Sequence, residues 1–242
     1  MSENSTSETP HIRLGNRPAV RQMVSQEADR LASIFPNADS TQIVKEARNN
    51  TAQDIRAERL KNEAERAKEN GETDELTSLL NRKGFEKRLK EVVARAKRFG
   101  GDTSVVYFDI NGLKGVNDES GHQAGDELIK RTAEVLQSST RETDIVARLG
   151  GDEMVAILTG TNVEDATKVW EKMELQFKAK NVKIAAGIAQ IDTATPQTVD
   201  ESLRLADAAM YKAKAESKAT GESKMRTFNE LTPDETFVNR AA

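Results

Sequence analysis

Acidic side chains stand at two places where the sequence predicts the end of a strand. Gly150 and Gly151 separate two apolar, β-branched runs and lead directly into Asp152 and Glu153. Gly-Gly supplies the positive φ angles of a tight hairpin turn, and acids after such a turn can simply face water. Asp109 ends another apolar run. If the fold brings Asp109 to the turn, the carboxylates form a cluster of hard oxygen ligands that suits Mg²⁺ bridging substrate phosphates.

Three polar residues after Asp109 extend this pattern. They are Lys114, Asn117 and Asp126. A lysine close to the acids would offset phosphate charge, but each of these residues taken alone is more often a solvated loop residue than part of a site. Only their assembly at one place would indicate a functional site.

Composition narrows the class of protein. The chain has 242 residues, a net charge of -4 and no cysteine. The charge does not indicate a nucleic-acid-binding protein, and the absence of cysteine excludes disulfides and thiolate metal sites. No apolar run is long enough to span a bilayer, and the N-terminus lacks a signal pattern. We therefore expect a cytoplasmic protein with neither nucleic acid nor membrane among its partners.

The N-terminal third is expected to be helical after a disordered tail. Residues 1–16 are polar with almost nothing to bury. Residues 17–72 form a helical extension of two predicted helices, divided at the Phe35-Pro36 step. The second helix, from Asp39 or Ser40 to Gly71, has only a thin, alanine-rich apolar stripe. Two interpretations stay open, a solvated helix lying on the domain and a dimerisation or signalling segment.

Strands and helices alternate in the rest of the chain. The patterns predict helices over 77–99, 122–138, 163–180 and 199–218, strands over 103–111 and 182–191, and a hairpin over 144–158. This order indicates an α/β sheet with helices packed on it. We assign residues 73–229 to one domain and 230–242 to a C-terminal tail.

Three sequence blocks together resemble a known family. "DELTSLLNRKGF" (74–85), "FDINGLKGVNDESGHQAGDELI" (108–129) and "ARLGGDEMVAIL" (147–158) are similar, in order and spacing, to the signature blocks of GGDEF domains, the diguanylate cyclases. The resemblance covers about residues 73–229. It implies a palm-like α/β domain, with a mostly antiparallel central sheet flanked by helices and preceded here by the α-helical extension.

The resemblance also implies roles for single residues. The metal ligands for Mg²⁺, or Mn²⁺, would be Asp109, the carbonyl of Ile110, Asp152 and Glu153. The acid at position 152 would also help to deprotonate the attacking 3′-hydroxyl, with Glu153 and Lys114 completing the catalytic set. Substrate would be bound by Asn117 and Asp126, which read guanine, by Gly150 and Gly151, which let the backbone approach phosphate, and by Lys214 and Lys218.

The implied reaction converts two GTP into cyclic di-GMP and two pyrophosphates in a homodimer. Arg141 and Asp144 match the RxxD site at which the product inhibits many family members; the alternative is a surface ion pair. Lys218 departs from the family pattern, which usually has arginine there, and lysine cannot clamp phosphate in a bidentate way. An alternative function is a catalytically silent GGDEF domain acting as a cyclic di-GMP receptor or interaction module.

Overall fold

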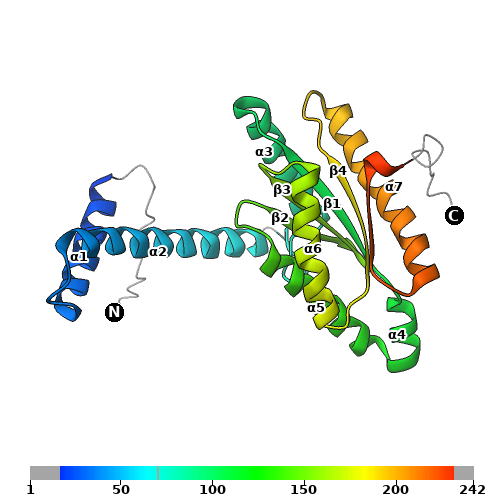
Figure 1. Ribbon diagram of the computed structural model, residues 1–242, viewed down its shortest axis with the longest axis horizontal. Helices are drawn as coiled ribbons and strands as arrows, with labels where there is room; N and C mark the ends of the chain where they lie inside the picture. Colours follow the sequence, from blue (N-terminus) through cyan, green and yellow to red (C-terminus); the bar gives the residue numbers. More distant parts are fainter. Residues whose placement is uncertain (1–16, 70, 232–242) are drawn as a thin grey trace, which may run out of the picture. The chain divides into compact units, whose positions relative to one another are not determined.

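The computed structural model describes residues 17–69 and 71–231 (Figure 1). The expected disordered tail, 1–16, and the expected C-terminal tail from 232 onward therefore lie outside the described residues. The chain divides into two compact units between Arg66 and Ala67. Across the described residues, none of the helices combines the length and the apolar character needed to cross a membrane.

The N-terminal unit is a pair of helices, as the sequence predicts. α1 spans Arg17–Ile34 and α2 spans Ser40–Glu69. The two helices pack through Leu31 and Ala47, which are both buried. Glu27 links them, because its carboxylate accepts a hydrogen bond from the Asn50 amide at 2.9 Å.

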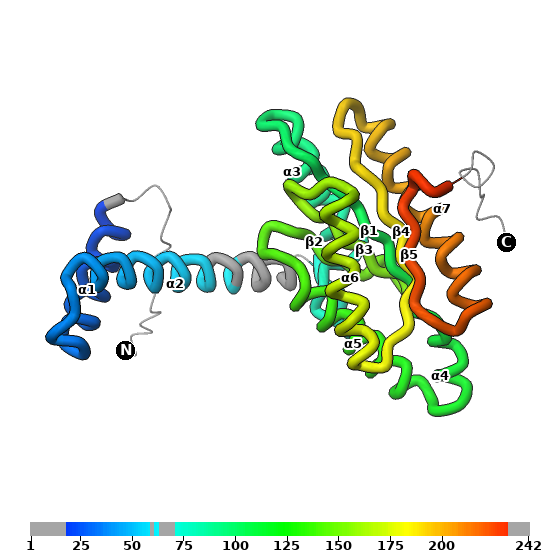
Figure 2. The backbone as a smooth tube through the Cα atoms, in the orientation of Figure 1, coloured from blue at the N-terminus to red at the C-terminus, as the bar shows by residue number. Residues whose placement is uncertain are grey.

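The second unit is built on a five-stranded sheet with the order β2-β3-β1-β4-β5, traced in Figure 2. The strands are β1 Thr103–Ile110, β2 Ile145–Gly150, β3 Glu153–Thr159, β4 Ile184–Gln190 and β5 Lys224–Thr227. Only β4 and β5 run parallel. The predicted mostly antiparallel sheet is confirmed. β5 was not predicted, because its four half-buried residues, KMRT, lack an apolar run.

Five helices and a short 3₁₀ turn accompany the sheet. They are α3 Arg82–Phe99, α4 Leu113–Ser120, α5 His122–Ser139, α6 Val163–Ala179, α7 Pro196–Thr220 and the turn Phe228–Glu230. The prediction of a helix from residue 77 is wrong at its start: Asn81 caps α3 by accepting a hydrogen bond from the Gly84 N–H. The preceding residues instead pair with β2, where Leu80 bridges to Ala147. α4 was not predicted, because it buries no residue.

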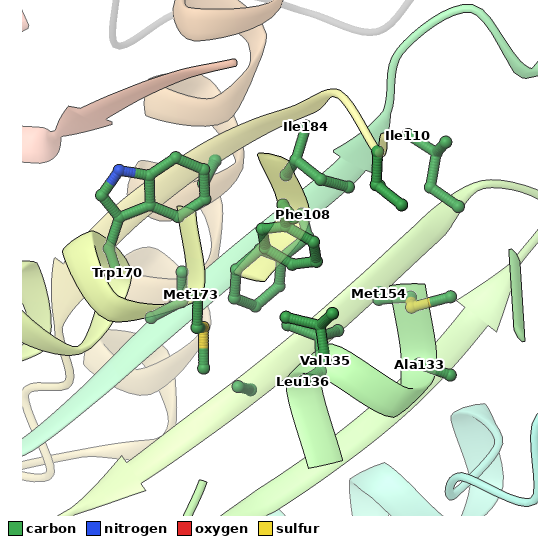
Figure 3. Packing of buried hydrophobic residues seen from close by; sticks show 14 of the residues in the cluster. Phe108, Ile110, Ala133, Val135, Leu136, Met154, Trp170, Met173 and Ile184 are labelled. Carbon is green, nitrogen blue, oxygen red and sulfur yellow. The ribbon is translucent and has the colours of Figure 1, made fainter. Parts of the chain in front are cut away.

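Alternating side chains of the strands fill two cores, one on each face of the sheet. On one face α5 and α6 cover Phe108, which stacks on Trp170 with ring centroids 6.4 Å apart (Figure 3). Met154 is fully buried in this core. On the other face α3 and α7 cover residues such as Val105 and Val155.

α7 lies unusually close to β4. A Cβ added to Gly187 would stand 2.1 Å from the carbonyl oxygen of Ala206 and 2.1 Å from the nitrogen of Met210. Glycine at position 187 is therefore what allows the helix backbone to rest directly on the strand. This contact fixes the helix that carries two of the predicted phosphate-binding lysines, Lys214 and Lys218.

Candidate active site

The sheet brings the first acidic strand end to the acidic turn. In the β1–β3 pair, Asp109 stands opposite Glu153. The Ile110 N–H donates to the carbonyl oxygen of Asp152 at 3.3 Å, which attaches the turn between β2 and β3 to the end of β1. The backbone therefore brings Asp109 next to Asp152 and Glu153, as the prediction of a metal site requires.

Asp109 is a buried acid with one unused oxygen. Its Oδ2 accepts a hydrogen bond from Lys214 Nζ at 2.6 Å, whereas its Oδ1 is buried with no partner among the described residues. Burial raises the pKa of Asp109, and the negative charges of Asp152 and Glu153 raise it further, while Lys214 opposes the shift. A cation bound to Oδ1 would remove this electrostatic cost.

This environment fits Mg²⁺ or Mn²⁺, because an unpartnered carboxylate oxygen beside two further acids is the hard donor that such ions prefer. Within the described ranges, no three His, Cys, Asp or Glu side chains converge on one point as a preformed metal cluster. Substrate phosphates and water would complete the coordination of a bound ion, as is usual for Mg²⁺.

An arginine that the sequence analysis did not single out holds the turn. Arg148 donates from Nε and Nη2 to the carbonyl oxygen of Gly151 at 3.0 and 2.8 Å. Its Nη1 is 3.2 Å from both carboxylate oxygens of Asp74. Although burial alone would raise the pKa of Asp74, hydrogen bonds from Thr77 and Arg148 hold that pKa below its usual range.

Gly150 and Gly151, the turn residues themselves, have φ angles of 149° and 53°. Both angles lie in the region that L side chains rarely adopt, so this turn needs glycine at both positions. A Cβ at either position would otherwise meet open space. The backbone of the turn is thus bare, and a phosphate can approach it closely.

The two predicted lysines of α7 lie one helical turn apart. Lys214 is partly exposed and paired with Asp109, and Lys218 is exposed in the last turn. Residues at this spacing share a helix face. The ion pair gives Lys214 a second role beside the predicted phosphate binding, because it balances the Asp109 charge.

α4 and α5 carry the remaining predicted residues. Lys114 is exposed in the first turn of α4, Asn117 is half-buried in the same helix, and Asp126 is exposed just after the first turn of α5. α4 follows Gly112, with φ 78°, and no side chain caps it. Uncapped N–H groups at a helix start suit a phosphate, so Lys114 and the start of α4 can act on the same anion.

Arg141 and Asp144 lie at the opposite end of the β2–β3 hairpin from the turn. Asp144 Oδ2 accepts from the Arg141 backbone N–H at 2.8 Å, and its Oδ1 accepts from the N–H and hydroxyl of Thr159 at 3.0 and 3.3 Å. Asp144 thus bonds the backbone of Arg141 and closes the hairpin, and the Arg141 side chain is exposed. An inhibitory role of RETD stays a prediction.

Comparison with known proteins supports the family suggested by these blocks. The family model described as "Diguanylate cyclase, GGDEF domain" matches residues 71–220. The chain belongs to the GGDEF family. The matched residues include β1, the glycine turn and α7, and so contain every site residue discussed above.

Relatives of this GGDEF domain include named cyclases. Diguanylate cyclase DgcP of Pseudomonas aeruginosa is 35% identical over 151 residues, which cover 59% of this chain and 22% of DgcP. The GGDEF domain of DgcB from Caulobacter crescentus, solved in complex with c-di-GMP, superposes with a TM-score of 0.59 at 26% identity over 66% of this chain and 94% of that domain. A longer DgcB structure, with coiled coil, gives 0.59 at 25% identity over 74% of this chain and 97% of its own.

Proposed function

We propose that this GGDEF protein is a diguanylate cyclase that joins two GTP molecules into cyclic di-GMP and releases two pyrophosphates. The observation that carries the proposal is the unpartnered buried oxygen of Asp109 beside the acidic turn. The activity of DgcP, to which the chain is similar, supports it. The chain spans about a fifth of the length of DgcP, 22%, so the activity is proposed for the shared domain.

In this mechanism the side chains position the substrate and neutralise the charge of its phosphates, as is usual for phosphoryl transfer. A bound Mg²⁺ or Mn²⁺, held by Asp109, the Ile110 carbonyl, Asp152 and Glu153, would supply charge neutralisation at the phosphates. The Asp152 carboxylate accepts the proton of the attacking 3′-hydroxyl. Bare glycine backbone in the turn lets the reacting phosphate lie close.

Cationic groups receive the rest of the triphosphate. Lys114 and the uncapped start of α4 face it from one helix, and Lys214 and Lys218 from another. Lys218 binds as a point charge rather than a planar fork, so its contribution is weaker than that of an arginine.

Base choice rests on α4 and α5. The Asp126 carboxylate accepts from the N1-H and N2-H₂ donors of guanine, a donor pair that adenine lacks. The Asn117 amide adds a donor and an acceptor. GTP is therefore the proposed substrate, and ATP would leave the carboxylate without its donors.

Each domain is proposed to hold one GTP, so the reaction needs two copies facing each other. The α1–α2 unit is the candidate for keeping two copies together, which raises the effective concentration of the second half-site. The DgcB structure, which contains a coiled coil and a GGDEF domain, supports this arrangement. Cytoplasmic location remains a prediction from composition.

Product inhibition at Arg141 is also proposed. The exposed guanidinium suits a phosphate of cyclic di-GMP, and Asp144 holds the adjoining backbone in place. The complex of the DgcB domain with c-di-GMP supports binding of this ligand by the fold.

The direct test is incubation of the purified protein with GTP and Mg²⁺, with products separated by chromatography over a range of protein concentrations. We expect cyclic di-GMP, at a specific activity that rises with protein concentration. Asp152→Ala should keep the fold, because the side chain lies at a turn, and should lower turnover by about 10²-fold or more. Wild-type turnover in this variant would refute the proposed role of the turn. Binding of cyclic di-GMP without turnover of GTP would favour the receptor alternative.

A further inference from the structure

Three glycines among those that the structure describes leave no room for a side chain. A Cβ at Gly84 would stand 2.3 Å from the carbonyl oxygen of Glu72, and one at Gly187 would meet backbone atoms of α7 at 2.1 Å. At both positions the obstacle is backbone, which cannot move without disturbing the fold. These two glycines therefore serve packing alone.

The third glycine is different, because its obstacle is a side chain. A Cβ added to Gly125 would stand 2.0 Å from Oδ1 of Asn117 and 2.9 Å from its Cγ. Gly125 is buried where α5 packs on α4, and it has an ordinary helical conformation, so backbone freedom does not require glycine there. What requires it is the amide of Asn117.

Glycine in a helix has a cost that this contact explains. Alanine would stabilise a helix interior by about 1 kcal/mol relative to glycine. Position 125 has glycine in spite of this lower stability, and it directly precedes Asp126, the residue proposed to bind the guanine base. The missing Cβ lets the Asn117 amide lie against α5, so that both proposed base-reading side chains start from adjoining places on two packed helices.

We propose that Gly125 is a positioning residue for nucleotide recognition: it sets where the Asn117 amide lies and thereby the affinity for the guanine base. The inference rests on the proposed function, since it assigns Asn117 to the base. Gly125 itself does not touch the nucleotide in this proposal. The proposal predicts that the effect of replacing Gly125 on GTP affinity depends on the presence of the Asn117 amide.

Gly125→Ala tests the proposal, and Gln123→Ala is its control. Gln123 is an exposed residue of the same helix, α5, and is not among the proposed substrate-binding residues. Because the obstacle at Gly125 is a movable side chain, the variant should fold while Asn117 is displaced. We expect the KM for GTP to rise about tenfold, the size of one lost base-reading hydrogen bond, with a smaller change in kcat. Gln123→Ala should keep the wild-type KM.

A double-mutant cycle with Asn117→Ala separates positioning from damage to the helix. Removing the amide removes the obstacle, so Gly125→Ala should have no further effect in the Asn117→Ala background. Equal and additive effects in both backgrounds would overturn the proposal, as would an unchanged KM in Gly125→Ala. Circular dichroism and thermal unfolding of all four proteins check the fold.

Binding gives a readout that does not depend on turnover. Calorimetric titration with α,β-methylene GTP, whose α,β bridge cannot be cleaved to release pyrophosphate, should show the same weakening in Gly125→Ala and the same lack of effect in the Asn117→Ala background. Wild-type protein that neither binds this analogue nor converts GTP would refute the proposed function itself. Wild-type binding that Gly125→Ala leaves intact would refute only the positioning role.

Discussion

The acids at the open end and beside the turn end of the β2–β3 hairpin differ in their hydrogen bonding. At the open end, where Arg141 and Asp144 lie, the Asp144 carboxylate receives three hydrogen bonds from Arg141 and Thr159. At the turn end, the acids stand beside Asp109, which is buried and has one oxygen without a partner among the described residues. Hydrogen bonds within the protein satisfy the acid at the open end, whereas the acid beside the turn has an oxygen that they leave available to a ligand.

The difference shows that one short acidic motif can stabilise the fold while another of similar length is available for chemistry. Buried polar atoms are almost always hydrogen-bonded, and an exception calls for a ligand, an ion or water. Asp109 is such an exception, but Asp144 is not. We infer that the turn end is the reactive one, and that Asp144 shapes the place where Arg141 acts.

A large effect on this contrast is expected from releasing the turn. Arg148→Ala removes two hydrogen bonds to Gly151 and the ion pair with Asp74, so we expect turnover to fall by about 10–100-fold and unfolding free energy by about 1–3 kcal/mol. Steady-state kinetics and denaturant unfolding measure the two effects.

Lys87→Ala is the control for that variant. Lys87 pairs with Glu72 at 2.8 Å, so it anchors the segment before α3 through a residue other than Asp74. The Lys87 side chain is half-exposed but Glu72 is buried, so Lys87→Ala should lower the unfolding free energy by about 1–3 kcal/mol and leave turnover near wild type. If Lys87→Ala lowers turnover as much as Arg148→Ala does, the effect belongs to the whole segment and not to the turn.

A smaller effect is expected at the open end. Arg141→Ala should leave the initial rate within about twofold of wild type, because the side chain is exposed and far along the hairpin from the acids, while weakening inhibition by the product about tenfold through loss of a charge-assisted contact. Progress curves with and without added cyclic di-GMP measure this. Identical curves for both proteins would remove the inhibitory role.

The smallest effect concerns the pH dependence of stability. A raised pKa means that folded protein binds the Asp109 proton more tightly than unfolded protein does. The unfolding free energy of wild type should therefore fall, relative to Asp109→Asn, as pH rises from the ordinary aspartate range through the raised pKa. Thermal unfolding of both proteins in EDTA over this range checks the slope. Parallel curves would contradict the shift.

Much of the fold could be predicted because its signals are local. Apolar runs mark β1, β3 and β4, and helical periodicity marks α5, α6 and α7. The start of α3 was misjudged because Leu79 and Leu80 continue its apolar spacing although Asn81 caps the helix. α4 and β5 bury no residue and so carry no periodic signal.

For the candidate site, sequence motifs could predict which residues take part but not which side chains contact one another. The pairing of Lys214 with Asp109 joins positions 105 residues apart, and Arg148 reaches 74 residues back to Asp74. No spacing rule predicts such contacts. The obstacle at Gly125 is equally invisible in sequence, because a glycine inside the predicted helix 122–138 does not indicate which side chain packs against it.

The same substitution beside the turn end and at the open end of the hairpin tests the contrast most directly. Turnover of GTP to cyclic di-GMP should be measured for Asp109→Asn and Asp144→Asn, at a temperature where both are folded. The account predicts a loss of about 10²-fold or more in Asp109→Asn, and in Asp144→Asn a lower melting temperature with turnover near wild type. Wild-type turnover in Asp109→Asn would contradict the assignment of the turn end as the reactive one.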